Sequence, residues 1–424
     1  MERVMEHQVV GKFSGALWVA GLLAVGTSVR AAENPGEYLS YSWKELAIQP
    51  QFDTSATFTD NLFYSRGANR VSDVLFTVSP GLKLQLGRDG QNQATLEYMH
   101  DETLLIDYSD FNTRQDRLQM AIRFVRGKIK VEGRDNLSFL SSILGGAISQ
   151  SRLLVDRMSL NDVYTVTYDW TEKTDFYLRG THFFVDYDRR TFLLDQQNIE
   201  GLLGMSYQWT PKLRLTLEGF YGNSSIGANA AAIAGPDSQF YGGFVGLRGT
   251  FTPKLTGSVR VGYEQREFSD GASASANTPA VGADLTYQFS NLTSVMLRYD
   301  RRTFPSPQFA NQISVTDSVN LSVFQLLGTS GRWLVRGTVR YDHNDLTATT
   351  LPTGGGTGIN VERTDSTMVL GAALVYQPQP WLTCVASYEF EDFGITFGSA
   401  TAGNLLQLVP YHNNRVSLSV AIGF

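Results

Sequence analysis

The chain has 424 residues, 12% of them aromatic and 40 of them glycine, and a formal net charge of −6. This modest negative charge argues against a nucleic-acid binder, which needs a basic surface. The single Cys384 excludes an intramolecular disulfide and a thiolate metal cluster. A chain of this length usually forms two or more soluble domains. No Pro/Ser-rich linker divides it, however, so we expect one large domain.

The N-terminus has the features of an export signal. Arg3 and Lys12 precede an apolar stretch over residues 13–25, which small residues follow, as at a signal-peptidase site. The stretch is shorter than the roughly 20 apolar residues that a spanning helix needs. A buried N-terminal helix is the alternative. We expect a cleaved signal peptide over residues 1–31 and a periplasmic segment over residues 32–45.

From Leu46 onward, segments of alternating polar and apolar residues recur, separated in turn by short turns and long polar loops. The turn Thr210-Pro211-Lys212, followed by Leu213, recurs almost literally at Thr252-Pro253-Lys254. Proline cannot donate to a strand ladder and therefore marks the turns. The pattern predicts a row of antiparallel hairpins.

The segments number about 18, with about 16 as the alternative, and both counts are even, as in single-chain bacterial barrels. The expected strands cover residues 46–59, 74–86, 93–101, 115–126, 128–140, 154–170, 175–188, 198–209, 213–222, 239–251, 255–264, 280–289, 292–300, 315–326, 332–341, 366–376, 381–390 and 414–424. We therefore expect residues 46–424 to form an all-β, up-and-down antiparallel barrel that crosses the outer membrane of a Gram-negative-type bacterium.

Aromatic residues on the apolar face lie in two rows. One row lies beside the short turns and comprises Trp170, Trp209, Phe251, Phe289 and Trp333. The other lies at the far ends of the strands and comprises Tyr221, Tyr263, Tyr299, Tyr341 and Tyr388. The separation is about nine residues, the length that a tilted strand needs to cross a bilayer. The rows indicate the two interfacial girdles, whereas a soluble β-sandwich would gather its rings in a core.

Charged residues are sorted by face. The apolar faces of the strands between residues 213 and 300 carry no ionisable group, as expected where a Lys or Arg at the bilayer midplane costs roughly 2–4 kcal/mol. The predicted lumen-lining residues are Arg214, Arg248, Arg260, Arg298, Arg336, Arg340, Glu218 and Asp284. Two interpretations remain open: these charges form cross-strand pairs that hold the wall together, or the arginines make an electropositive bore that favours anions. In the second case we expect Arg260, Arg298 and Arg336 at similar heights.

The last segment places Val416, Leu418 and Val420 on one face and ends at Phe424. A soluble edge strand could alternate in the same way. An aromatic final residue, however, resembles the terminal signal of bacterial outer-membrane barrels. That resemblance implies that the barrel-assembly machinery binds Phe424.

A phrase in the first hairpin resembles a known family. The matching residues are Thr59-Asp60-Asn61-Leu62-Phe63, Ser72-Asp73, Val78-Ser79-Pro80-Gly81-Leu82 and the Thr-Pro-Lys-Leu turns at 210–213 and 252–255. They resemble a family of outer-membrane β-barrel porins found in bacterial exopolysaccharide and capsule loci. The resemblance covers the mature chain, implies passage of a secreted polysaccharide and assigns no catalytic residue. Physically, Ser79-Pro80-Gly81 is typical of a local bend or bulge.

No recognisable catalytic set is present in the sequence. His100, His182, His343 and His412 each fall at the outer end of a strand or in a loop, where His182 and Asp186 could form an acid/base pair. The sequence contains no nucleophile elbow, no metal-ligand pair at helical spacing and no phosphate loop. We therefore expect no enzymatic activity, no cofactor and no metal.

Three functions remain open. The favoured one is passive diffusion of small solutes or passage of a secreted polysaccharide, because a barrel of about 18 strands can enclose an aqueous lumen. The second is a structural or interaction role for a barrel plugged by its own loops at residues 354–356 or 393–409. An outer-membrane hydrolase is less favoured. The expected partners are membrane lipid, lipopolysaccharide and an anionic solute or polysaccharide, and not nucleic acid.

Overall fold

The computed structural model describes residues 41–87, 92–144, 154–188, 193–227, 237–269, 275–306, 312–328, 330–351, 359–398 and 410–423. Its strands are β1 (Tyr41–Trp43), β2 (Leu46–Thr59), β3 (Asp73–Leu86), β4 (Gln93–Leu105), β5 (Thr113–Arg126), β6 (Ile129–Ile143), β7 (Leu154–Asp169), β8 (Thr174–Tyr187), β9 (Gln196–Gln208), β10 (Leu213–Ile226), β11 (Ser238–Thr252), β12 (Leu255–Phe268), β13 (Ala276–Ser290), β14 (Thr293–Pro305), β15 (Ile313–Leu327), β16 (Trp333–Leu351), β17 (Ile359–Gln379), β18 (Leu382–Phe397) and β19 (Tyr411–Gly423).

In addition to the strands, the described ranges contain two short 3₁₀ helices, η1 (Gly67–Asn69) and η2 (Ser109–Phe111). They contain no helix that is long and apolar enough to cross a membrane.

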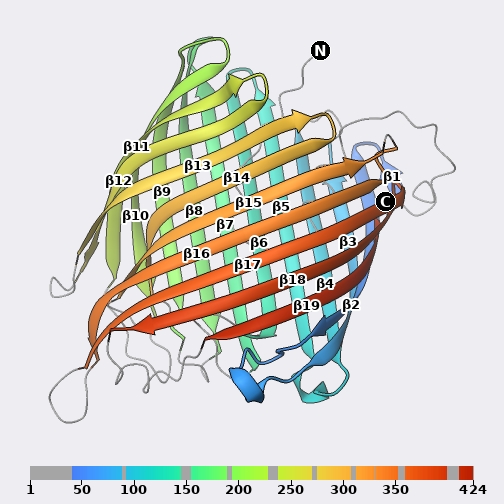
Figure 1. Ribbon diagram of the computed structural model, residues 1–424. Helices are drawn as coiled ribbons and strands as arrows, with labels where there is room; N and C mark the ends of the chain where they lie inside the picture. Colours follow the sequence, from blue (N-terminus) through green and yellow to red (C-terminus); the bar gives the residue numbers. More distant parts are fainter. Residues whose placement is uncertain are drawn as a thin grey trace.

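The 18 strands from β2 to β19 close an antiparallel barrel (Figure 1). Each of these strands pairs with its neighbours in chain order, and β19 pairs with β2 to complete the ring. The short β1 lies beside β2 and pairs Tyr41 with Ile48. Closure matters because the hydrocarbon core of a bilayer offers no water to an unpaired strand edge. The structure therefore confirms the predicted fold and decides for 18 strands rather than 16.

The two ends of the barrel differ. Turns at one end are short, such as the one between Arg126 and Ile129, and both Leu46 and Gly423 lie at this end. The connections at the other end are longer, and the first of them carries η1, seen at the bottom of Figure 1. Outer-membrane barrels have their short turns in the periplasm and their long loops outside. The η1 end is therefore the outer end.

The predicted strands are too short at the outer end. The sequence pattern predicts strands over residues 332–341 and 366–376, whereas β16 continues to Leu351 and β17 begins at Ile359. Alternation of polar and apolar residues is lost in this region because both faces become polar. Backbone pairing between β16 and β17 continues regardless. These strands therefore extend beyond the apolar band.

Of the bend or bulge expected at Ser79-Pro80-Gly81, the bulge is not formed. β3 pairs with β2 without a register shift from Asp73 to Leu86. On its other edge, the pairs Val78↔Glu102 and Gly81↔Met99 keep the same register. Proline lacks the amide proton that a strand ladder needs. The ladder between β3 and β4 is interrupted only at Ser79 and Pro80.

Side-chain exposure separates the two faces of the wall. On β10, Leu217 and Tyr221 are both 55% exposed, whereas Phe220 and Ser224 are 5% and 1% exposed. The exposed apolar residues face outward, toward lipid. Residues of both predicted aromatic rows are exposed in the same way, for example Trp209 at 61%.

Several expectations concern residues outside the described ranges. They are the signal peptide over residues 1–31, most of the segment over residues 32–45, the loop residues 354–356 and the last residue, Phe424. Of the second expected plug, residues 393–397 belong to β18, and residues 399–409 lie outside the described ranges.

Two adjacent positions on β12 test the assignment of faces. Val259 pairs with Leu247 and Ala283 on the lipid side, whereas Ser258 pairs with Arg248 and Asp284 on the inner side. We expect Val259→Arg to lower the yield of heat-modifiable folded barrel far more than Ser258→Arg, because a midplane Arg facing lipid costs roughly 2–4 kcal/mol. Electrophoresis of unheated and heated samples measures this yield. Equal losses in the two variants would contradict the assignment.

Candidate functional site on the inner wall of the barrel

The inner wall carries the predicted lumen residues in continuous rows of paired strands. One such row consists of Arg248, Ser258, Asp284, Arg298, Asn320 and Arg340, one residue from each strand between β11 and β16. Side chains paired in this way alternate with the lipid-facing ones along every strand. The row therefore brings four of the predicted lumen residues onto one inner surface.

Most of the predicted arginines have a carboxylate partner. The ion-pair distances are 3.7 Å from Arg260 to Glu218, 3.5 Å from Arg260 to Asp300, 3.4 Å from Arg298 to Asp284 and 3.0 Å from Arg340 to Asp342. Arg214 contacts Asp175 directly. One of these pairs joins the neighbouring strands β13 and β14, three join strands two apart, and the Arg340–Asp342 pair lies within β16. The four pairs between strands support the first of the two interpretations, in which the charges hold the wall together.

The three arginines expected at similar heights belong to three different rows. Arg298 pairs with Asn320, and Arg260 lies one row nearer the outer end, paired with Gly282 beside Asp300. Arg336 pairs with Phe324 and Ala373, nearer the short turns. Because the strands are tilted, such rows run obliquely to the barrel axis. Counted from the first residue of its strand, each of the three arginines lies three to five residues from the short-turn end, and their similar heights stay a prediction.

Four other inner-wall cations lack such a partner. Among the described residues, no carboxylate lies within 4.0 Å of the charged nitrogens of Lys83, Arg134, Arg179 or Arg248. Each lies within a few residues of the short-turn end of its strand, on the arc from β3 to β11. Unpaired cations at a wet surface are the ones that act on passing anions.

Water reaches several charged groups on the inner wall. The side chains of Arg340, Asp284, Glu389 and Arg123 are 40%, 43%, 44% and 49% exposed. An ionised group that had to be buried would need full compensation by partners. These exposures therefore indicate an aqueous lumen along this part of the wall.

One arc of the inner wall, from β8 to β14, is dry by contrast. Phe220, Phe240 and Phe244 are 5%, 1% and 3% exposed and pack together with Tyr177 and Leu202. Arginine side chains cover these rings, with the Arg260 guanidinium 4.6 Å from the Phe244 ring centre, Arg266 4.3 Å from Phe240 and Arg302 4.9 Å from Phe220. Such stacking stabilises a desolvated cation.

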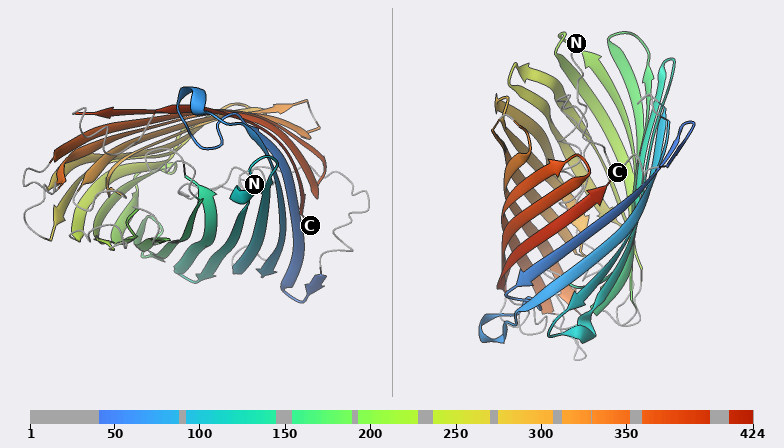
Figure 2. Two further views of the ribbon diagram at one scale, coloured as in Figure 1. Left: turned by 90° about the horizontal axis from the view of Figure 1, so that it is seen from below. Right: turned by 90° about the vertical axis from the view of Figure 1, so that its right-hand side faces the viewer.

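Ion pairs in this arc connect strands that are not neighbours. Arg302 on β14 lies 3.0 Å from Glu264 on β12 and 2.9 Å from Glu200 on β9. Arg266 lies 3.8 Å from Glu264 and donates to Thr303 at 2.9 Å. Contact between β9 and β14 requires a tight bend in the wall. Accordingly, the barrel seen from below is wider in one direction than in the other (Figure 2).

Glycines on the inner face make this bend possible. A Cβ atom on Gly222 would lie 2.2 Å from Cζ of Phe240, and one on Gly204 would lie 2.2 Å from Cζ of Tyr177. The rings therefore occupy space that any other residue type would fill. The glycines of β9 to β12 allow close packing inside the narrow part of the barrel.

Sequence reasoning missed Arg266, Arg302 and Glu200 as lumen residues. Arg266 and Arg302 follow Arg260 and Arg298 at even spacing on the same strands, so alternation alone could have identified them. Their ion-pair partners, however, depend on the bend of the wall, which cannot be predicted from the alternation of polar and apolar residues.

The four histidines of the described residues lie at the outer end, beside carboxylates. The distances are 2.8 Å from His100 to Asp116, 3.3 Å from His182 to Asp162, 3.3 Å from His343 to Asp345 and 2.5 Å from His412 to Asp392. The structure thus gives His182 a carboxylate partner other than the expected Asp186. Since His100 shares the outward face of Tyr98, whose hydroxyl donates to Asp116 at 2.6 Å, this pair lies on the membrane side of the wall.

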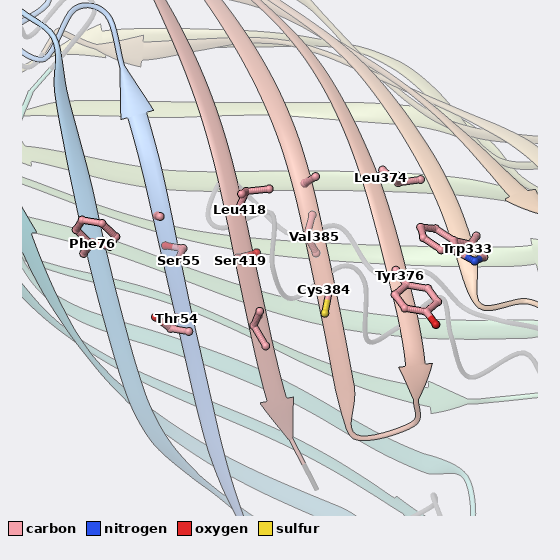
Figure 3. A pocket seen from close by; sticks show the side chains of 13 residues that line it. Thr54, Ser55, Phe76, Trp333, Leu374, Tyr376, Cys384, Val385, Leu418 and Ser419 are labelled. Atoms are coloured by element: carbon pink, nitrogen blue, oxygen red, sulfur yellow. The ribbon is translucent and has the colours of Figure 1, made fainter.

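A shallow groove of about 520 Å³ lies across β16 to β19, β2 and β3 (Figure 3). Phe76, Trp333, Leu374 and Leu418 line it and are 46%, 39%, 39% and 62% exposed. The groove therefore belongs to the lipid-facing surface and is separate from the inner wall. Among the described residues, no group of three or more His, Cys, Asp or Glu side chains could hold a metal ion.

A closed ring of tilted strands with a lipid-facing apolar band and a charged inner wall defines a transmembrane β-barrel of the outer-membrane type. The chain matches the family model described as "Putative beta-barrel porin 2" over residues 178–404. That match spans more than half of the chain, and the chain belongs to this β-barrel porin family. Members of such porin-like families are outer-membrane proteins of Gram-negative bacteria.

Solved structures with a similar fold include channels and receptors of Pseudomonas aeruginosa. OpdQ is 14% identical, with 90% of this chain and 98% of that chain covered and a TM-score of 0.45. OpdK with vanillate is 10% identical, with 89% and 99% covered and a TM-score of 0.45. The siderophore receptor PirA is 10% identical, with 89% and 80% covered and a TM-score of 0.43. No curated protein matches the chain.

Two glycines on β10 test the role of the narrow arc. Gly222 faces the Phe240 ring, whereas a Cβ atom on Gly219 would meet nothing within 4 Å. We expect Gly222→Ala to lower the free energy of unfolding by about 1–3 kcal/mol through overpacking. Gly219→Ala should leave it nearly unchanged. Urea titration of the detergent-folded barrel measures both values, and equal effects would show that the arc is not tightly packed.

Proposed function

We propose that the protein is an outer-membrane channel through which small hydrophilic solutes diffuse. The observation that carries this proposal is the solvent exposure of charged side chains on the inner wall, such as Asp284 and Arg340 at 43% and 40%. A barrel of this strand number encloses space beyond its own side chains. Membership of the β-barrel porin family supports the same conclusion.

We assign solute preference to the inner cations that have no carboxylate partner among the described residues. These are Lys83, Arg134, Arg179 and Arg248. The field of an ion pair largely cancels at a distance, whereas an isolated cation in a low-dielectric wall raises the local concentration of anions. The channel should therefore favour anions, and the preference should fall as salt screens the field.

Passage of a secreted polysaccharide is a second candidate, which an inner patch of hydroxyl groups supports. Thr57 and Ser417 are hydrogen-bonded at 2.7 Å across the β2–β19 junction, and Thr77 and Thr103 at 2.9 Å across β3 and β4. Hydroxyl groups both donate and accept hydrogen bonds, as sugars do. Blockage of the ionic current by a neutral oligosaccharide would support this candidate, and an unaffected current would argue against it.

Export and membrane partners complete the proposal. Residues 1–31 would act as a cleaved signal peptide, because their basic start and short apolar stretch are typical of one. The outer ring of His–Asp and Tyr–Asp pairs would contact lipopolysaccharide headgroups. Phe424 would be the contact for the barrel-assembly machinery. N-terminal sequencing of the protein from isolated outer membranes tests the first of these statements directly.

Single-channel recording in planar bilayers tests the proposed function. We expect stepwise conductance and, in a salt gradient, a reversal potential that indicates anion preference. The triple variant Arg134→Gln, Arg179→Gln, Arg248→Gln should lose most of that preference at low ionic strength while staying folded.

The matched control removes a paired set of charges instead. The double variant Arg298→Gln, Asp284→Asn deletes an ion pair without changing the net charge, and it should leave ion preference nearly unchanged. Cation preference in the unmodified protein would contradict the assignment of selectivity. A folded barrel that conducts no ions would contradict the channel and favour a barrel plugged by its loops.

A further inference from the structure

The connection between β2 and β3, residues 60–72, contains part of the sequence motif that resembles the porin family. It has a compact fold. The backbone N–H of Leu62 donates to the carbonyl of Val71 at 2.8 Å. The Asn61 side chain accepts from the Ser65 N–H at 2.8 Å and donates to the Ser65 carbonyl at 2.9 Å. Such side-chain bonds to the local backbone hold a turn without regular secondary structure.

One side of this connection is bound to the last strand. The Asp60 carboxylate accepts from the backbone N–H of Asn414 at 2.7 Å and from its side-chain amide at 2.6 Å. Asn61 donates to the His412 carbonyl at 2.7 Å. Hydrogen bonds to an ionised group are stronger than neutral ones. The connection is therefore attached where β2 and β19 close the ring.

The other side of the connection is bound to the β4–β5 connection. Phe63 is 1% exposed, and its ring centre lies 5.3 Å from that of Tyr108 and 4.8 Å from that of Phe111. The Asp73 carboxylate accepts from the backbone N–H groups of Asp107 and Tyr108 at 3.1 and 3.2 Å. Residues 60–72 are thus attached along one arc of the outer mouth, from β19 to the β4–β5 connection.

Tyr64 contacts the inner wall between these two attachments. Arg415 donates to its hydroxyl at 2.6 Å, and the Tyr64 and Tyr411 ring centres are 5.0 Å apart. Arg415 belongs to the inner face, where it pairs with Glu389 and Glu391 at 3.0 and 3.2 Å. Burial raises the pKa of the Tyr64 hydroxyl above its usual value, so the group stays neutral beside Arg415.

The backbone of Tyr64 is in an unusual conformation. Its φ angle is +52°, in the left-handed region that bulky residues rarely adopt. Such a conformation costs of order 1–3 kcal/mol and persists only where surrounding contacts determine it. The contacts to Arg415 and Tyr411 do so here, and they direct the ring toward the inner side of the wall.

We propose that residues 60–72 form a fixed constriction at the outer mouth of the channel, and that Tyr64 is the residue that sets its width. This inference rests on the proposed channel function. The connection leaves β2 at the ring closure and places the Tyr64 ring and the Arg415 guanidinium on the inner side of the wall, beside the solute path. Tyr64 and Arg415 thereby select solutes by size and by charge before they reach the inner cations.

The test compares Tyr64→Ala with Asn69→Ala, a control in the exposed η1 of the same connection. Removal of the ring should raise the single-channel conductance about twofold, while the control conducts like the unmodified protein. Unchanged conductance in a folded Tyr64→Ala barrel would overturn the proposal.

Hydrogen exchange supplies a second measurement that does not depend on conduction. The amides of Leu62 and Ser65 are hydrogen-bonded within the connection. They should be protected in the unmodified protein and in Asn69→Ala, and should exchange at least about tenfold faster in Tyr64→Ala. If no variant conducts ions, the proposed channel function fails. Hydrogen exchange then remains as the test of whether residues 60–72 are held in a fixed conformation. Unprotected amides in the unmodified protein would then overturn the inference.

Discussion

The requirement that every backbone N–H and C=O group inside the hydrocarbon core has a partner determines the rest of this structure. Sheets meet it only by closing on themselves, which here means that β19 returns to pair with β2. A closed wall has two faces in different solvents, so residues must alternate along every strand. The sorting of charges and the two aromatic rows follow from this one constraint.

A closed barrel need not be round, and this one bends tightly between β8 and β14. Between β8 and β14, inner glycines such as Gly222 let aromatic rings lie against the backbone, and Arg302 connects strands as distant as β9 and β14. The cost of burying these charges is offset because each has a partner. Elsewhere the wall is wet, with Arg340 and Asp284 partly exposed. One molecule therefore combines a dry stabilising arc with a hydrated surface that solutes can pass.

Alternation in the sequence predicted most of the fold because it records the two solvents directly. It placed Ser258 and Val259 on opposite faces, as the strand pairing shows, and it identified the short turns from their prolines. It could not report the outer extensions of β16 and β17, where both faces are polar. It also could not assign partners to the lumen arginines, because the contact between Arg302 and Glu200 depends on the bend of the whole wall. The inward position of Tyr64 depends likewise on contacts to a strand at the far end of the chain.

The central claim is that one face of each strand lies in water and the other in lipid. Cysteine scanning along β12, in a Cys384→Ser background, tests this claim most directly. A charged, membrane-impermeant maleimide should label Thr256→Cys and Ser258→Cys in lipid vesicles. Val259→Cys and Val261→Cys should stay unlabelled until detergent is added. Uniform labelling of successive positions, or labelling of the valine positions alone, would contradict the account.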